Sequence, residues 1–409
     1  MKFLHSDWII TCDDNFNIIQ NGAIVFDKHI IDIGNFDEIQ AKYPNQTFTY
    51  LKPNSVIMPG LINSHIHLEF SANKTTLKYG NFVQWLFSVI QNREILIENA
   101  TEELIDNKLQ DMIKNGTTTI GAISSYGFDM NSCIKTPLNV VYFTEVLGSQ
   151  AAMIDTLFLD FQEKLKTAQS NKNEKFTPAI AIHSPYSTHP FLIREVLKIA
   201  KEQNLCVSAH FQESKAENDW LNYSKGEFEP FFKDMLKQET SLQKPNEFLN
   251  QFKNIKNLSF THCVEANKNE LNQIKQLNAT IIHCPNSNKL LTNKALNLNY
   301  IDNINLAIGT DGLSSNYTLN MFDEIRNSFF IHTNIPNKLL AQKLLTSATN
   351  GGAKALGTNS GILAINKDAD IISFNLPDKI ENQEDLAIAV ILHTTKVNNT
   401  YIKGQNELF

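Results

Sequence analysis

The stretch V-I-M-P-G-L-I-N-S-H-I-H-L-E, residues 56–69, decides the fold and the chemistry of this chain. It joins a continuous apolar run, residues 56–62, to two histidines that lie two positions apart, His65 and His67. In an extended backbone, residues i and i+2 point to the same side. The two imidazoles are therefore expected to meet at the carboxyl end of a strand, where they suit a divalent metal ion.

Similar apolar runs recur along the chain, with amphipathic segments of helical period between them. Eight strands are expected, at residues 56–62, 117–123, 138–143, 179–182, 205–209, 258–261, 279–282 and 306–309. Continuous apolar strands indicate a sheet that is buried on both faces. Eight strand–helix units over about 260–290 residues favour a closed parallel barrel over an open sheet. The sequence thus predicts an α/β fold, a (β/α)8 TIM-type barrel over residues 53–356.

The two ends of the chain differ from this central part. Residues 1–52 and 357–409 are rich in short β-strands and turns and carry no long helical pattern. We expect these segments to pair into a small β-sandwich beside the barrel. Two further segments, residues 68–116 and 214–256, are too long for simple crossovers. They are predicted to form lids, because the loops at the carboxyl ends of barrel strands surround the active site.

Composition limits the possible partners and the cellular compartment. The 409 residues carry a net charge of −7, and 42% of them are hydrophobic. The negative charge argues against nucleic-acid binding, and no apolar run is long enough to span a membrane. The five cysteines are never spaced C-x-x-C, which argues against a disulfide framework. Since Asp7 interrupts the start before any signal-peptide core, a cytoplasmic location is expected.

Further polar residues follow the later predicted strands. In a parallel barrel the carboxyl ends of all strands surround one mouth, so residues far apart in sequence converge there. Any one of these histidines alone would more often be an ordinary core or rim residue, but their repeated placement favours a common site. The residues are His183, His210, His262, His283 and Asp311.

This series resembles the amidohydrolase superfamily over nearly the whole chain. The resemblance rests on the H-x-H at His65 and His67, on histidines after the fifth and sixth strands, and on Asp311 after the eighth. The H-x-x-E of residues 210–213 is similar to the adenosine and cytosine deaminase branch. The H-C-P-N-S-N of residues 283–288 and the G-I-L of residues 361–363 resemble the S-adenosylhomocysteine deaminase and chlorohydrolase-like group.

The resemblance implies one divalent metal ion, and the donor types agree with it. Its ligands would be His65, His67, His210 and Asp311. Neutral imidazole nitrogens with one carboxylate suit Zn²⁺ first and Fe²⁺ second, with a position left for water. Dinuclear members of the superfamily carry a carboxylated lysine after the fourth strand. This chain has His183 there, which favours a mononuclear site.

The resemblance also assigns catalytic and substrate-binding residues. Glu213 is expected to shuttle the proton, His262 to orient the attacking hydroxide, and Asp311 to take the proton of the water. Glu69 is expected to accept hydrogen bonds from ribose hydroxyls, with a solvated helix start as an equally weighted alternative. His183 is expected to contact the sugar or a carboxylate of the substrate. Only three arginines occur, and the sequence does not identify which side chains hold such a carboxylate.

The expected reaction is the metal-dependent hydrolysis of the 6-amino group of an adenine nucleoside. The stretches N-S-H-I-H-L-E and A-H-F-Q-E-S are similar to those of short deaminases that act on 6-aminodeoxyfutalosine, in the futalosine route to menaquinone. The resemblance therefore implies this nucleoside as the substrate. Two alternatives stay open within enzymes, a deaminase of S-adenosylhomocysteine, 5′-methylthioadenosine or adenosine, and a chlorohydrolase-like aminohydrolase. A catalytically inactive barrel that serves as a binding module is the alternative outside enzymes. A homodimer is also expected from the resemblance.

Overall fold

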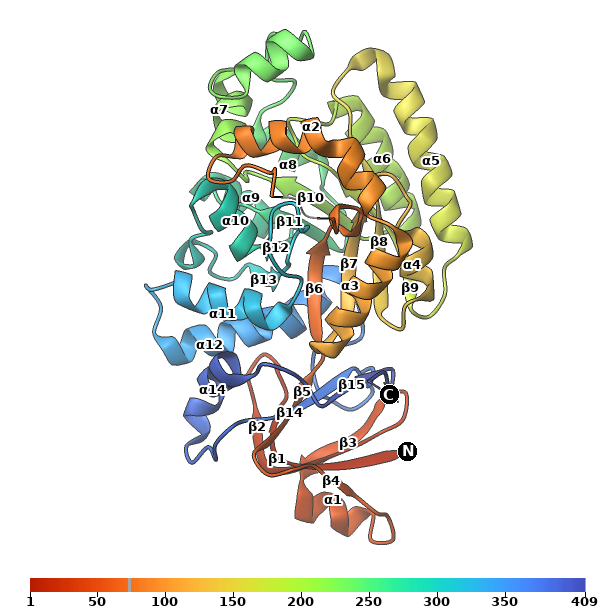
Figure 1. Cartoon of the computed structure of the whole chain (residues 1–409), viewed down its shortest axis with the longest axis vertical. Coiled ribbons are helices and arrows are strands. Elements are labelled where there is room, and N and C mark those ends of the chain that lie inside the picture. Colours follow the sequence, from red (N-terminus) through yellow and green to blue (C-terminus); the bar gives the residue numbers. More distant parts are fainter. Residues whose placement is uncertain (73–74, 409) are drawn as a thin grey trace.

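Eight parallel strands form the centre of the larger part of the molecule (Figure 1). The structure is a computed structural model, and it describes residues 1–72 and 75–408. The strands pair in sequence order, and nearly all of their residues are buried. They are β6 (Leu61–Ile66), β7 (Thr117–Ser124), β8 (Asn139–Val146), β9 (Phe176–Ile182), β10 (Val207–Phe211), β11 (Leu258–His262), β12 (Thr280–His283) and β13 (Asn305–Ile308). The predicted TIM-type barrel is confirmed.

The first and last barrel strands are joined by hydrogen bonds between β6 and the residues that follow β13. The backbone N–H of Asp311 donates to the carbonyl of His65 at 3.0 Å. Asn63 connects the same two strands, because its Oδ1 accepts from the N–H of Thr310 at 3.0 Å and its Nδ2 donates to Oγ1 of Thr310 at 2.7 Å. These bonds bring the H-x-H motif and Asp311 together although they lie far apart in the sequence.

Helices connect the strands and cover the outside of the barrel (Figure 1). Each of them presents apolar residues to the barrel, as α6 does with Leu192, Ile193 and Val196, which are buried in the same core as strands β9 and β10. The helices are α3 (Glu102–Lys114), α4 (Met130–Lys135), α5 (Ile154–Ser170), α6 (Pro190–Gln203), α8 (Pro245–Gln251), α9 (Lys268–Gln276), α10 (Pro285–Thr292), α11 (Met321–Ile331), α12 (Asn337–Thr346) and α13 (Gly352–Leu356).

The two ends of the chain form one hydrogen-bonded sheet below the barrel (Figure 1). Its central pairings join β5 to β1 and to β14, so an N-terminal and a C-terminal segment are neighbours. The expected association of the termini is therefore confirmed. The sheet contains β1 (Lys2–Ile10), β2 (Ile18–Phe26), β3 (Ile30–Asn35), β4 (Thr49–Tyr50), β5 (Ser55–Pro59), β14 (Ile371–Asn375), β15 (Asn399–Ile402) and β16 (Gln405–Asn406), and it is accompanied by α1 (Phe36–Lys42) and α14 (Leu386–His393).

The predicted first strand, residues 56–62, is divided between the two sheets. Strand β5 ends at Pro59 and belongs to the terminal sheet, whereas β6 begins at Leu61 and belongs to the barrel. Gly60 lies between the two strands. A glycine is required there because a Cβ atom would lie 2.2 Å from the side chain of Thr118. The apolar run is continuous because both strands are buried, so hydropathy alone could not reveal the change of sheet. The domain limits 1–52, 53–356 and 357–409 stay an interpretation of the sequence.

The two predicted lid segments pack against each other over the mouth of the barrel. The first contains η1 (Leu68–Phe70) and α2 (Phe82–Asn99), and the second contains α7 (Lys215–Tyr223) and η3 (Phe231–Met235). Phe82 meets Phe228 in an edge-to-face contact with ring centroids 5.9 Å apart, and Phe87 meets Phe231 at 5.8 Å. Trp85 Nε1 donates to the carbonyl of Ser314 at 2.8 Å and so fastens α2 to the loop after β13.

Among the residues that the structure describes, no helix has the length and apolarity needed to cross a bilayer.

Candidate metal and substrate site

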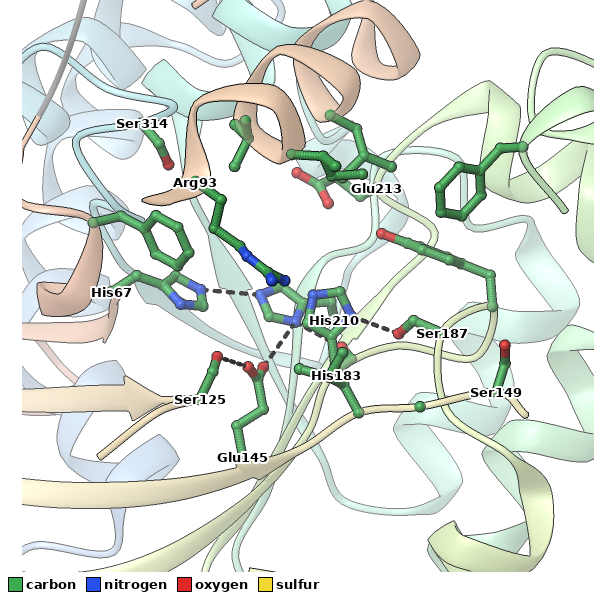
Figure 2. Close-up of a pocket in the computed structure, with 18 of the residues that line it drawn as sticks. His67, Arg93, Ser125, Glu145, Ser149, His183, Ser187, His210, Glu213 and Ser314 are labelled. Atoms are coloured by element: carbon green, nitrogen blue, oxygen red, sulfur yellow. Dashed lines mark hydrogen bonds and ion pairs between the residues drawn. The ribbon is translucent and has the colours of Figure 1, made fainter. Parts of the chain in front are cut away.

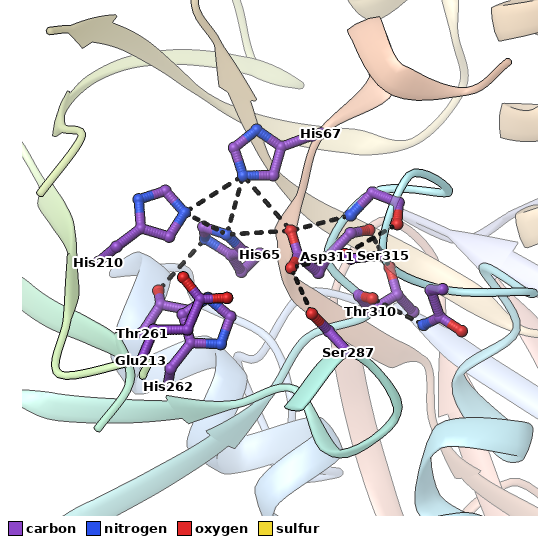
Figure 3. Close-up of polar contacts among 12 residues, drawn as sticks. His65, His67, His210, Glu213, Thr261, His262, Ser287, Thr310, Asp311 and Ser315 are labelled. Atoms are coloured by element: carbon purple, nitrogen blue, oxygen red, sulfur yellow. Dashed lines mark hydrogen bonds and ion pairs between the residues drawn. The ribbon is translucent and has the colours of Figure 1, made fainter. Parts of the chain in front are cut away.

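Three histidines and one aspartate converge at the carboxyl ends of β6, β10 and β13 (Figure 3). The Nε2 atom of His65 lies 3.1 Å from that of His67 and 3.1 Å from that of His210, and the last two are 3.3 Å apart. Oδ1 of Asp311 lies 3.5 Å from His67 Nε2 and 3.8 Å from His65 Nε2. The structure thus brings all four predicted metal ligands together.

These separations are short enough for the four groups to bind one divalent ion. With metal–ligand bonds of about 2.0–2.1 Å, neighbouring ligand atoms lie roughly 3.3–3.4 Å apart, and a water would be a further ligand. Burial, followed by the neighbouring histidines, holds the pKa of His65 well below its usual value. Burial, followed by His183, lowers the pKa of His210 to about 3. Both rings are therefore neutral, and each can offer a lone pair to a cation.

Three of the four ligands, His65, His210 and Asp311, are oriented by further hydrogen bonds. The Nδ1–H of His210 donates to the carbonyl of His183 at 2.6 Å, which leaves Nε2 as the unprotonated atom that faces the cluster. Nδ1 of His65 lies 3.2 Å from Oγ1 of Thr261. The second oxygen of Asp311 accepts from two serine hydroxyls at 2.8 and 2.9 Å, those of Ser287 and Ser315. The ligand atoms are therefore held in place by the protein itself.

The backbone is strained where several of these side chains leave the strands. Gln212, His262 and Asp311 have φ values of +52°, +75° and +61°, in the left-handed region that residues with a side chain rarely adopt. Gly309 allows β13 to approach the H-x-H strand, because a Cβ atom at this position would lie 2.8 Å from Cβ of His65. Such strain is typical of functional sites, where surrounding contacts fix a geometry that the backbone alone disfavours.

Glu213 and His262 form a pair beside the predicted metal position (Figure 3). Oε1 of Glu213 lies 3.4 Å from Nε2 of His262, whose Nδ1 bonds to Oδ1 of Asn288 at 2.8 Å. Burial, and then the charges of Asp311 and Glu217, raise the pKa of Glu213 well above its usual range. For Asp311, burial would raise the pKa, but the four surrounding histidines lower it below its usual value. The site therefore combines an ionised aspartate with a protonated glutamic acid.

The loop that carries Glu213 is fixed by Glu217, which the sequence interpretation did not single out. The carboxylate of Glu217 accepts the backbone N–H groups of Gln212 and Glu213 at 2.9 and 2.8 Å. Ser214 caps the helix α7 that presents Glu217. A glutamate three residues after a serine is a recognised helix-start signal, so this anchor could have been found in the sequence.

A cavity of about 520 Å³ opens from the metal cluster towards the two lid segments (Figure 2). This volume lies within the about 300–1,000 Å³ of typical small-molecule sites. At one end it is lined by the predicted residues His67, His183, His210, Glu213, His262 and Asp311. The opposite wall is mostly apolar and aromatic, and it includes Phe82, Trp85, Leu86, Val89 and Ile90 of α2, Met153, Leu157 and Phe232.

His183 lines this cavity, as its predicted contact with substrate requires. Its Nδ1 lies 2.6 Å from Oγ of Ser187, so Nε2 is the ring nitrogen that stays available. Burial, followed by His67, lowers the pKa of His183 to about 4, and the ring is neutral. Contact with the substrate stays a prediction for this residue.

Glu69 does not lie among the residues that line the cavity. It is 1% exposed, and its two oxygens accept the backbone N–H groups of the loop after β7 at 2.7–3.3 Å, those of Ser125, Tyr126, Gly127 and Phe128. Oγ of Ser124 adds a further bond at 3.2 Å. This arrangement gives no support to the predicted ribose contact. Glu69 instead shapes a loop whose first two residues, Ser125 and Tyr126, do line the cavity.

Two charged residues of the cavity were missed by sequence reasoning. Glu145 ends strand β8, its side chain is fully buried, and its Oε1 has no hydrogen-bond partner, while Oε2 accepts from the hydroxyl of Ser125. Arg93 projects from α2. A polar residue at the end of the third strand could have indicated Glu145, but nothing local in the sequence of α2 indicates that Arg93 faces a cavity.

The other residues beside the motifs make structural contacts and do not line the cavity. Nε2 of His283 lies 3.0 Å from Nε2 of His332, and neither residue lines the cavity. Cys263 and Cys284 are buried in apolar clusters, as the alternation of side chains along a strand predicted.

Comparisons with known proteins agree on one group. The amidohydrolase family model matches residues 56–406. A curated aminodeoxyfutalosine deaminase of Nitratiruptor sp. is 46% identical over 391 residues, which cover 96% of each chain. A curated adenosine deaminase of Helicobacter pylori is 35% identical over 411 residues, 99% of each chain. The crystal structure of Helicobacter pylori aminofutalosine deaminase in complex with methylthio-coformycin matches with a TM-score of 0.95 at 34% identity, covering 99% of this chain and 100% of that one.

Proposed function

The chain belongs to the amidohydrolase family, and from this premise we propose that it hydrolyses the 6-amino group of an adenine nucleoside, with 6-aminodeoxyfutalosine as its substrate. The substrate assignment follows the relative with 46% identity over almost the full length. The observation that carries the reaction class is the position of Glu213, a buried acid that lies with His262 and Asp311 in one cluster, with its Oε1 3.4 Å from Nε2 of His262. Burial raises its pKa well above its usual range, which suits a proton donor.

His65, His67, His210 and Asp311 would hold one divalent ion, and their nitrogen and oxygen donors favour Zn²⁺ over Fe²⁺. Such an ion lowers the pKa of water and so supplies a nucleophile at neutral pH. Glu213 donates its proton to the ring nitrogen next to the carbon that is attacked, which makes that carbon electrophilic. His262 orients the nucleophile through Nε2, because its Nδ1 is already bonded to Asn288.

The proton balance of the reaction can be followed through the same residues. Asp311 accepts a proton from the attacking water, and the C–O bond forms as the ring nitrogen receives the proton of Glu213. The proton held by Asp311 then passes to the exocyclic nitrogen, the C–N bond breaks, and ammonia leaves. The ring nitrogen keeps its proton, and the product is the hypoxanthine nucleoside. As the C–N bond breaks and the C=O bond forms, the hydroxyl group derived from the water gives its remaining proton to Glu213, which restores the acid for the next cycle.

We propose that the sugar binds beside Glu145 and His183, which both line the cavity. Oε1 of Glu145 has no hydrogen-bond partner and lies 4.0 Å from Nδ1 of His210, so it can accept a hydrogen bond from a hydroxyl group. The free Nε2 of neutral His183 can bond to a second hydroxyl. A buried carboxylate oxygen without a partner is costly, so a hydroxyl of the bound nucleoside would relieve this cost.

The experiment that tests the function is a panel of adenine nucleosides assayed with the purified, metal-loaded chain. The panel contains 6-aminodeoxyfutalosine, adenosine, 5′-deoxyadenosine, 5′-methylthioadenosine and S-adenosylhomocysteine, and the ultraviolet change from adenine to hypoxanthine measures turnover. The highest kcat/KM is expected for 6-aminodeoxyfutalosine. A higher value for the adenosyl thioethers would replace this substrate. Failure of the purified chain to take up metal, together with no turnover of any nucleoside, would indicate a binding module.

A further inference from the structure

The three arginines of the chain differ in what their guanidinium groups contact. Arg194 forms an ion pair with Glu195 at 3.3 Å, and Arg326 forms one with Asp323 at 2.8 Å. Within residues 1–72 and 75–408, Arg93 forms no ion pair with a carboxylate. Its side chain extends from α2 into the cavity, as Figure 2 shows. Of the lysines and arginines that the structure describes, Arg93 alone lines that cavity.

Tyr126 is a polar neighbour of Arg93 in the lining of the cavity. The positive charge of the guanidinium group acts on the hydroxyl of Tyr126, whose ring stacks on Phe128 with centroids 6.1 Å apart. The backbone N–H groups of Tyr126 and Phe128 are bound by the buried carboxylate of Glu69. Arg93 and Tyr126 therefore approach each other from two separate segments, and both can donate hydrogen bonds to one ligand group.

The surroundings of Arg93 define the kind of ligand group. Leu86, Val89 and Ile90 line the cavity from the same helix, and Met153 and Leu157 line it from the segment after β8. These side chains suit an apolar or aromatic substituent. A guanidinium without an acidic partner binds a planar carboxylate through two parallel N–H···O bonds.

From these contacts we infer that Arg93, assisted by Tyr126, binds a carboxylate at the end of an apolar substituent on the nucleoside and so selects acidic substrates over neutral ones. The inference rests on the proposed function and extends it to the residue that sets specificity. A nucleoside with a benzoate substituent, such as 6-aminodeoxyfutalosine, has this chemistry. Adenosine and 5′-deoxyadenosine lack both the apolar substituent and the charge.

The test compares one pair of ligands on matched variants. The ligands are 6-aminodeoxyfutalosine and its carboxamide, which has the same shape without the charge. The variants are Arg93→Met, Arg93→Lys and the control Arg194→Met, which removes an arginine whose partner lies outside the cavity. Steady-state kinetics gives kcat and KM, and calorimetry on the same variants gives the dissociation constant in a background where Glu213→Gln prevents turnover.

The native chain should prefer the carboxylate over the carboxamide by about 100-fold in kcat/KM, mainly through KM. Arg93→Met should reduce this preference to nearly one, Arg93→Lys should restore part of it, and Arg194→Met should retain it. Equal losses for both ligands in Arg93→Met would show that Arg93 only supports the lid. An unchanged preference in that variant would also overturn the inference.

Calorimetry separates this inference from the proposed reaction. If the native chain deaminates neither ligand but binds the carboxylate more tightly through Arg93, the reaction is wrong and the assignment of Arg93 holds. If the native chain deaminates both ligands equally well, the reaction holds and the assignment of Arg93 is wrong. Failure to bind either ligand would overturn both.

Discussion

The two ends of the cavity are built in different ways. The metal-binding end uses buried side chains at the ends of barrel strands, such as His65 and His262, and a second polar group fixes each of them. The opposite wall comes from α2, residues 214–256 and the segment after β8, is mostly apolar, and includes the partly exposed Ile90. Rigid strand ends position the chemistry to within fractions of an ångström, whereas longer segments between strands can vary and set the choice of substrate.

The largest effect is expected from removing a ligand at the metal-binding end. His65→Ala should lose the metal and lower kcat/KM by more than about 10³-fold, because the nucleophile is no longer formed at neutral pH. Metal content by mass spectrometry and turnover on the same sample check this. The control variant His189→Ala should keep its metal, because the ring of His189 lies outside the cavity at the start of α6. One equivalent of metal retained in His65→Ala would refute the ligand set.

The next largest effect is expected from replacing Glu213, the acid at the metal-binding end of the cavity. Glu213→Gln should lower kcat by about 10²–10⁴-fold while metal binding and nucleoside binding persist, because only proton donation is lost. The raised pKa also fixes a pH dependence. Since the protonated form is the active one, native kcat should fall as the pH rises through the raised pKa of Glu213, and the residual rate of the variant should lack this limb. Near-native turnover in the variant would exclude Glu213 from the mechanism.

A smaller effect is expected where the barrel supports the opposite wall. Glu69→Gln leaves part of the buried backbone N–H groups of residues 125–128 without an acceptor, so the free energy of unfolding should fall by about 1–3 kcal/mol. KM should rise for all nucleosides alike, as denaturant unfolding and kinetics would show. A loss confined to substrates with intact ribose hydroxyls, with unchanged stability, would restore the direct sugar contact predicted from the sequence.

The smallest effect is expected from Asp129, a buried residue next to the loop of residues 125–128. Asp129 and Glu69 share the hydroxyl of Ser124, and burial, followed by the charge of Glu69, raises the pKa of Asp129 to about 7. The folded state therefore holds this proton more tightly than the unfolded chain, and stability must fall as the pH rises from the unfolded pKa through 7. We expect the unfolding free energy to drop by about 1–3 kcal/mol between pH 5 and pH 8, and by less in Asp129→Asn. Equal slopes in both proteins would contradict this.

The sequence predicted an element correctly where a residue pattern has a single physical cause. Continuous apolar runs revealed the barrel strands because a strand that is buried on both faces leaves no polar position. It failed at residues 56–62, where two buried strands of different sheets read as one run. It did not foresee that the Glu69 carboxylate binds the loop after β7, because spacing from His67 shows proximity to the mouth but not the direction of the side chain. The ribose contact of Glu69 stays a prediction.

The sequence by itself indicated the barrel, the pairing of the chain ends and the donor types that meet at the mouth. The period of the side chains along each strand is a local property that can be read from the residues. A parallel barrel then brings the carboxyl ends of all its strands to one mouth. Only the tertiary structure decided which side chains share the cavity with that cluster. Arg93 and Glu145 lie far apart in sequence from each other and from the histidines, in segments of ordinary pattern. Their meeting depends on how the lid segments pack across the barrel, and packing between distant segments leaves no periodic trace in the residues that take part.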